Sequence, residues 1–114
     1  MKLVKQDDAD KFANSDKCFG LEYSLNEPAM NLAVIEIHGR YPSENYVVNE
    51  ISKEICYVVS GDGKIAKKNG EILEFTAGDM VFIDSGEAYY WDAECKVATI
   101  CAPAWAEKQH KEVK

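Results

Sequence analysis

The sequence predicts an all-β domain whose sheet closes into a small barrel or jelly roll. Short β-rich runs follow one another from residue 31 to residue 102, separated by Gly, Asn, Asp, Ser or Pro, a pattern typical of sandwiches and barrels. No long stretch has the spacing of an amphipathic helix. Strands this short and numerous must close or stack to hide their edges, and a barrel does so.

Seven runs are the clearest expected strands. They cover residues 32–38, 54–59, 64–67, 71–75, 80–83, 88–91 and 96–101. Asn69-Gly70 predicts a hairpin between the third and fourth runs, because this pair tolerates the two positive φ angles of a type I′ turn. Gly61 and Gly63 also stand where a run ends, so we expect the chain to reverse there.

The two ends of the chain are less regular than the centre. Residues 1–30 suggest a short helix near 7–14 and one strand around 21–24. The tail, residues 105–114, is rich in helix formers of alternating charge. We expect a short C-terminal helix there, with Trp105 packed against the barrel.

Length and composition indicate one domain. The 114 residues, 46% of them apolar, suffice for a single core, so we expect one domain over 1–114 with its barrel at roughly 31–104. The four cysteines, at positions 18, 56, 95 and 101, form no CxxC pair. Free thiols are therefore expected rather than disulfides or a zinc knuckle.

The charge balance disfavours polyanionic partners. Twenty acidic residues against thirteen basic ones give a formal net charge of -7, which repels phosphate backbones and anionic lipids. We therefore expect no nucleic acid and no membrane partner. Neither a secretory signal nor an apolar run of about 18 residues is present, so a cytoplasmic protein is expected.

Two segments resemble the conserved motifs of the cupin superfamily. Residues 54–63 read EICYVVSGDG and residues 73–86 read LEFTAGDMVFIDSG. The first matches the motif in which a glutamate, here Glu54, precedes a strand and a Gly-x-Gly turn. The second has the Gly78-Asp79 pair that opens a strand, although the proline of its closing turn is replaced by Asp84. The resemblance covers residues 32–104 and implies a conserved-barrel, double-stranded β-helix fold that pairs as a homodimer.

The resemblance also implies a metal site, from which this chain departs. Metal-binding members use His-x-His before the motif glutamate and a third histidine after the second motif. Those positions fall here on residues 47–50 (Val-Val-Asn-Glu) and on Tyr89. Only Glu54 is retained, and one carboxylate with an amide and a phenol is a weak substitute for three imidazoles. We therefore expect no metal and no other cofactor.

Strand alternation predicts which side chains share the barrel interior with Glu54. Residues two apart lie on one face of a strand, which groups Cys56 with Glu54 and Trp91 with Tyr89. If these faces and the face of His38 all point inward, these five side chains meet at the mouth of the barrel. Asn49 is expected to lie there as well. Aromatic walls with a few polar groups are the common composition of a small-molecule site.

Each candidate residue has a second interpretation. Glu54 is either a pocket carboxylate that acts as general base or ligand anchor, or a strand-end glutamate paired with Lys53. His38 is either a proton shuttle or a half-exposed histidine at the end of its strand. Tyr89 and Trp91 either stack on a ligand or pack in the core.

The remaining candidates are equally open. Asn49 and Glu50 stand where the cupin resemblance places ligands, but they also suit a polar loop. Cys56 and Cys101 form either a redox or nucleophilic pair or two buried inert thiols.

Three functions follow from these candidates, and the sequence does not decide whether the protein is an enzyme. The first is metal-independent binding of a small polar or sugar-like metabolite, or of a carboxylate compound. In that case Glu54, with Tyr89 or His38 as partner, would transfer protons as isomerases and epimerases do. The second is a non-catalytic sensing or structural module. The third is a metalloenzyme in which Glu54, His38 and Asn49 or Glu50 hold a hard divalent ion.

Overall fold

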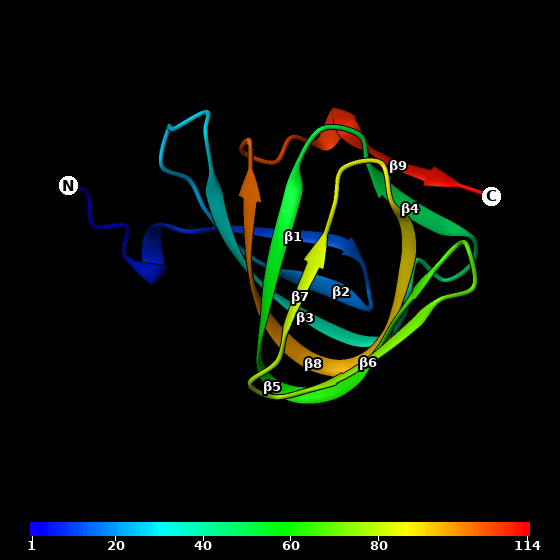
Figure 1. Cartoon of the computed structure of the whole chain (residues 1–114). Coiled ribbons are helices and arrows are strands. Elements are labelled where there is room, and N and C mark those ends of the chain that lie inside the picture. The colour runs from blue at the N-terminus through cyan, green and yellow to red at the C-terminus, as the bar shows by residue number, and fades with distance from the viewer.

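The computed structural model describes all 114 residues. Its nine strands form one curled sheet (Figure 1). The strands are β1 (Asp10–Ser15), β2 (Cys18–Tyr23), β3 (Asn31–Tyr41), β4 (Tyr46–Asn49), β5 (Lys53–Lys67), β6 (Ile72–Thr76), β7 (Met80–Ile83), β8 (Ala88–Ala102) and β9 (His110–Val113). Two single 3₁₀ turns, η1 (Gln6–Asp8) and η2 (Glu107–Gln109), complete the chain. The expected all-β barrel is confirmed. No helix reaches the length and apolar character that a membrane crossing requires.

The long strand β8 organises the barrel. It pairs antiparallel with the whole of β3, with β5 along its other edge, and with β4 near its start. Strands β2 and β1 extend the sheet beyond β3, whereas β6 and β7 pair with the two ends of β5. Figure 1 shows β5 and β8 curving together around the interior, so both strands contribute side chains to one enclosed core.

Alternating side chains of these strands build the core as expected. On β5, Glu54, Cys56 and Val58 are buried and the residues between them are exposed. On β8 the inward positions continue from Tyr89 to Cys101. Each fully buried aliphatic side chain in such a core contributes roughly 1.5–3 kcal/mol relative to leaving it in water.

The expected reversal at Gly61 and Gly63 is wrong, because β5 continues through them. A register shift between Val58 and Ser60 bends the strand against β8, and pairing resumes with Ser60 opposite Lys96 and continues through Gly61. Gly61 has φ +84°, and a Cβ there would collide with the backbone of Glu94. These glycines let two long strands bend across each other, which is how the runs 54–59 and 64–67 become one strand.

The Asn69-Gly70 hairpin is present, but its turn differs from type I′. Only Gly70 has a positive φ, +96°, and the Lys67 amide donates to the Glu71 carbonyl across three residues. This is the geometry of a longer loop that ends in one left-handed residue.

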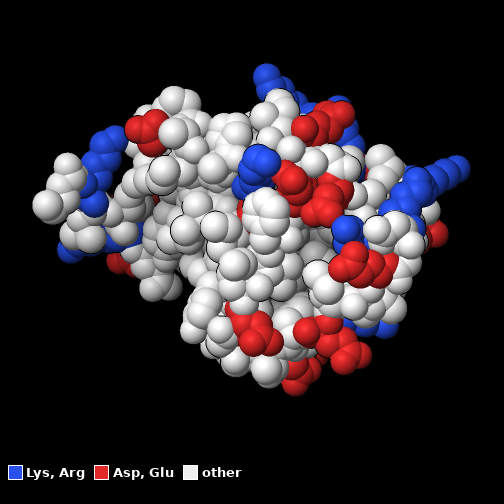
Figure 2. Space-filling model, viewed as in Figure 1, with Lys and Arg blue, Asp and Glu red and all other residues white.

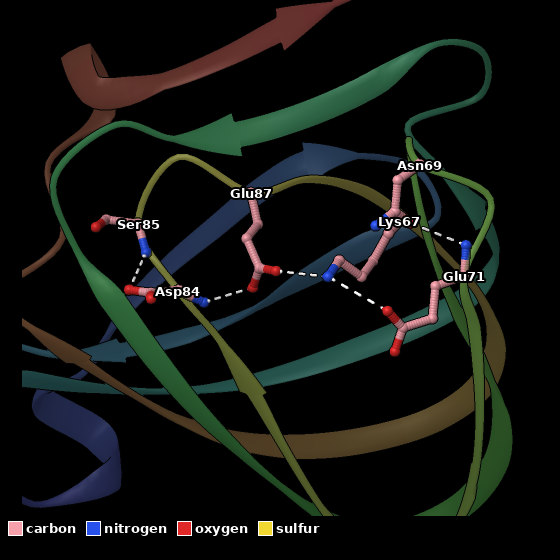
Figure 3. Close-up of polar contacts among 6 residues, drawn as sticks. All are labelled: Lys67, Asn69, Glu71, Asp84, Ser85 and Glu87. Carbon is pink, nitrogen blue, oxygen red and sulfur yellow. Dashed lines mark hydrogen bonds and ion pairs between the residues drawn. The ribbon is translucent and has the colours of Figure 1, made fainter.

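Ion pairs join this turn to the one between β7 and β8 (Figure 3). Lys67 Nζ lies 2.8 Å from a Glu87 oxygen and 3.4 Å from a Glu71 oxygen. The second Glu87 oxygen accepts the Asp84 amide at 2.9 Å. The Lys67 ammonium lowers the pKa of Glu87, so the network aligns two neighbouring turns at one end of the barrel.

Both termini differ from the expected helices. Residues 10–15 form β1, which pairs with β2, and the tail forms only η2 followed by β9, which pairs with β4. The buried Gln109 accounts for the second difference. Its side-chain oxygen accepts the Ile51 and Ser52 amides at 2.9 and 2.7 Å, and its amide nitrogen donates to Ser52 Oγ at 2.7 Å. These bonds outweigh the intrinsic helix propensity of the tail.

The bend in β5 predicts a difference between two glycine substitutions. Gly61→Ala combines a left-handed backbone with backbone overlap, so we expect it to lower the free energy of unfolding by roughly 3 kcal/mol. Gly70→Ala meets no neighbouring atom, and its cost should be about 1 kcal/mol. Urea unfolding of both variants measures this difference; equal losses would contradict the close approach of β5 to β8.

Candidate active site

A pocket opens on the concave face of the barrel and encloses a cavity of about 60 Å³. Strands β1, β2, β3, β5 and β8 and the tail all contribute to its wall, which is mainly aliphatic and aromatic. The polar side chains on this wall include Glu54, Tyr41, His110 and Thr99. The composition, mainly apolar with a few polar groups, matches that of small-molecule sites.

Glu54 is a buried carboxyl with three hydrogen-bond donors. It is 8% exposed. Asn49 Nδ2 donates to its Oε1 at 2.6 Å, and the thiols of Cys101 and Cys56 lie 3.5 and 3.8 Å from its two oxygens. Burial raises the pKa of Glu54, and these donors only partly oppose the shift. The carboxyl therefore keeps its proton to a higher pH than an exposed glutamate does.

Asn49 connects Glu54 to the tail of the chain. Its Oδ1 accepts the Trp105 indole N–H at 3.2 Å and faces His110 Nδ1 at 2.8 Å. An indole nitrogen can only donate, so this contact identifies the amide oxygen and leaves the amide nitrogen for Glu54. Because that oxygen can only accept, His110 Nδ1 must carry a proton.

The tautomer of His110 determines the role of Tyr41. With its proton on Nδ1, the neutral imidazole accepts at Nε2 the Tyr41 hydroxyl, 2.9 Å away. The two rings are nearly parallel, with 6° between their planes. Burial lowers the pKa of His110 and raises that of Tyr41. A hydrogen-bonded path therefore runs from Glu54 through Asn49 and His110 to Tyr41.

Tyr89 and Trp91 both lie on the pocket wall, as their alternation predicted. They pack edge to face, with ring centroids 6.4 Å apart and planes at 89°, and Phe75 packs edge-on against Trp91 from behind. Burial, with Glu54 nearby, holds the pKa of Tyr89 well above 10. Tyr89 is thus a neutral phenol at the pocket wall.

The expected inward orientation of His38 is wrong. Its ring lies on the outer surface, 2.8 Å from Glu94 and 3.4 Å from Glu36, with 43% of the side chain exposed. The opposite face of β3, which carries Ile35 and Ile37, lines the pocket. The pairing of β3 with β8 sets this orientation. Glu36 and His38 share one face of β3, and their charge was the sequence feature that indicated an exposed face.

The other candidates lie in three different surroundings. Glu50 is exposed, so it does not face the pocket. Asn49 and Cys56 are each 1% exposed and support Glu54 from behind rather than forming the wall. His110 was missed, although it is the only other histidine and follows Trp105, which was expected to pack against the barrel.

The donor set does not fit a resident metal ion. Both His110 nitrogens already have hydrogen-bond partners, and burial raises the pKa values of the Cys56 and Cys101 thiols, which keeps both protonated. No three Asp, Glu, Cys or His side chains converge as metal ligands. The alternative ligand set of Glu54 with His38 and Asn49 or Glu50 is not assembled, because His38 lies outside the barrel.

Comparisons with known proteins agree on the fold. A family model described as the EutQ-like cupin domain matches residues 36–98, and no curated protein matches the sequence. Streptomyces Pac13, solved with uridine and described as a nucleoside dehydratase, superimposes with a TM-score of 0.87 at 18% identity, covering 100% of this chain and 92% of that one.

Two further solved structures share the fold at similarly low identity. The polyketide cyclase RemF from Streptomyces resistomycificus has a TM-score of 0.76 at 15% identity and covers 100% of this chain and 86% of its own. Ectoine synthase from P. lautus has a TM-score of 0.70 at 18% identity, with coverages of 90% and 80%.

The raised pKa of Glu54 predicts a pH-dependent difference between the wild type and Glu54→Gln. A carboxyl whose folded pKa lies above its ordinary 4.5 favours folding below pH 4.5, and this contribution is lost as pH rises through the folded pKa. Glutamine stays neutral and loses nothing. We therefore expect the stability of the variant, relative to wild type, to increase from pH 4.5 to pH 8 in urea titrations. A difference independent of pH would contradict the shift.

Proposed function

Since this chain belongs to the family of EutQ-like cupin domains, we propose that its barrel binds a small polar or sugar-like molecule and transfers protons on it without a metal. The reaction class is that of an isomerase or epimerase. The observation that carries the proposal is the hydrogen-bonded path from Glu54 to Tyr41, both of which line the same pocket.

An acid and a base on this path have complementary protonation states. Burial favours the neutral carboxylic acid of Glu54 and the neutral imidazole of His110, because it raises the pKa of Glu54 and lowers the pKa of His110. Glu54 therefore holds a proton that it can donate, and His110 has a lone pair that can accept one.

Proton transfer then needs only residues already in place. Tyr41 takes a proton from the substrate as its own hydroxyl proton passes to His110 Nε2, while Glu54 delivers its proton to a second substrate atom. The substrate keeps its proton count, and the imidazolium and carboxylate that remain are linked through Asn49. Exchange with water restores both groups.

Two further considerations support the proposal. Trp91, Tyr89 and Trp105 give the site aromatic walls, and such apolar surroundings strengthen polar interactions in the pocket. Pac13, RemF and ectoine synthase are described as enzymes of small organic molecules, and one was solved with uridine. The same barrel therefore has precedents for this use.

Deuterium incorporation tests proton transfer directly. Compounds that raise the melting temperature in a metabolite panel are incubated with the protein in D₂O and followed by NMR. We expect exchange at a carbon-bound position, reduced about 100-fold or more in Glu54→Gln and in Tyr41→Phe. Glu74→Gln, which alters an exposed carboxylate on β6, is the control and should behave as wild type.

Two results would argue against this function. Exchange that persists in both variants would exclude the path from Glu54 to Tyr41. Binding without any exchange would instead support a sensing module. No binding by any compound would overturn the small-molecule function itself.

We propose that two copies of the chain form a homodimer through the outer face of the barrel. The exposed side chains of Ile55, Tyr57, Met80, Phe82 and Ile100 adjoin one another across β7, β5 and β8. Figure 2 shows the centre of this face as largely uncharged, with both acidic and basic groups around it. A two-fold interface joins the same patch on both copies. Each copy carries a net charge of -7, so contacts between the charged parts of their surfaces are unfavourable.

Sedimentation tests the dimer. Wild type should sediment at twice its 12.8 kDa chain mass, and Phe82→Asp should shift it to the monomer because a charge would be buried in the interface. Ile72→Asp, an equally exposed apolar position on β6, serves as the control. A wild-type monomer would contradict the proposal.

A further inference from the structure

Two rows of side chains cross the floor of the pocket and bring its polar groups together. In the first, Cys101 of β8 pairs with Asn31 of β3 on one side and with Glu54 of β5 on the other. In the second, Ala33 of β3 lies between Glu22 of β2 and Thr99 of β8. We call Glu22, Asn31, Glu54 and Thr99 the polar patch; all four line the pocket.

Thr99 is the member of the patch without a strong partner. Its side chain is 2% exposed, and its Oγ1 forms no hydrogen bond to a nitrogen or oxygen atom of the protein. Its remaining contact is the thiol of Cys56, the residue paired with it on β5, and a thiol is at best a weak hydrogen-bonding group. A buried hydroxyl with so weak a partner is costly, so its persistence on a pocket wall indicates a ligand group that completes it.

The charge of the patch limits what that group is. Neither lysine nor arginine lines the pocket, and His110 is neutral with both nitrogens engaged. Glu22 is half-buried and has Asp10 beside it on β1. An anionic ligand would lose its hydration, find no cationic side chain and lie near the carboxyl groups of Glu22 and Glu54, which is unfavourable.

A cationic ligand is not the best match either. The carboxyl at the inner end of the pocket, Glu54, favours its neutral form, so it supplies little charge to compensate an ammonium group removed from water. A neutral carboxylic acid and a hydroxyl instead pair well with uncharged groups that both donate and accept hydrogen bonds.

We propose that the polar patch binds the uncharged, hydroxyl-bearing or amide-bearing end of the substrate, with Thr99 as a direct contact, and that the pocket rejects phosphates and carboxylates. This inference rests on the proposed function, because it concerns the same pocket. It also removes the carboxylate compounds from the substrates that the sequence left open.

A charge-matched series of compounds tests the selection. Tyrosol, 4-hydroxyphenylacetate and tyramine share a phenol ring that fits against the aromatic wall, but they end in an alcohol, a carboxylate and an ammonium group. Titrations followed through the Trp105 indole N–H signal give each affinity, and further aromatic alcohols with their acid and amine analogues extend the series. We expect the alcohols to bind at least about 10-fold more tightly than the acids, and more tightly than the amines.

Two variants separate the parts of the proposal. Thr99→Val should weaken tyrosol binding about 5- to 10-fold, as expected for one lost hydrogen bond, yet keep or raise the melting temperature because the unpartnered hydroxyl is gone. Glu22→Gln should tighten the binding of 4-hydroxyphenylacetate several-fold. Thr76→Val and Glu74→Gln, both exposed on β6, are the matched controls and should leave binding unchanged.

The outcomes distinguish this inference from the function on which it rests. Acids or amines that bind as tightly as the alcohols, or a Thr99→Val variant with unaltered affinity, would overturn the inference alone. The same holds if no alcohol binds while other compounds of the metabolite panel do. A pocket that binds no compound of any charge would overturn the proposed function.

Discussion

The side-chain amide of Asn49 is the interaction on which the site depends. It holds the Glu54 carboxyl with its nitrogen and the Trp105 and His110 rings with its oxygen. Being 1% exposed, it cannot exchange these partners for water. One uncharged group thereby sets the position of a carboxyl, the tautomer of an imidazole and the docking of the tail, so these features are coupled rather than independent.

The same amide explains how the protein tolerates acidic and basic groups inside an apolar barrel. A buried carboxylate facing an imidazolium would need both charges to be desolvated, and the attraction seldom compensates for that loss. Here both groups are kept neutral by burial and are connected by neutral donors and acceptors. The surrounding thiols behave similarly, since burial raises the pKa values of Cys56 and Cys101 and leaves them as weak donors to Glu54.

The long strands provide the frame for this arrangement. Because β8 pairs with β3 along one edge and β5 along the other, residues from three strands meet in straight rows across the concave face. The polar patch, which includes Glu54, occupies two such neighbouring rows. Bending at Gly61, where β5 approaches the β8 backbone closely, closes the barrel around them.

The sequence by itself determined the class of fold and the strand faces of the motif region. The cupin motifs and the alternation on β5 and β8 predicted the barrel and the inward direction of Glu54, Tyr89 and Trp91, because period-two patterns depend only on neighbours along the chain.

Tertiary structure alone decided which face of β3 points inward, that β5 continues through Gly61, and that Asn49 binds Glu54. His38 follows Ile37, and His110 stands between Gln109 and Lys111; the local pattern gives neither of them a reason to enter the site. Pairing with β8 turned His38 outward, whereas the buried contacts of Gln109 and the pairing of β9 with β4 brought His110 to Asn49, 61 residues away. Contacts between residues so distant in sequence form only when the whole chain has folded, and for that reason no local signal contained them.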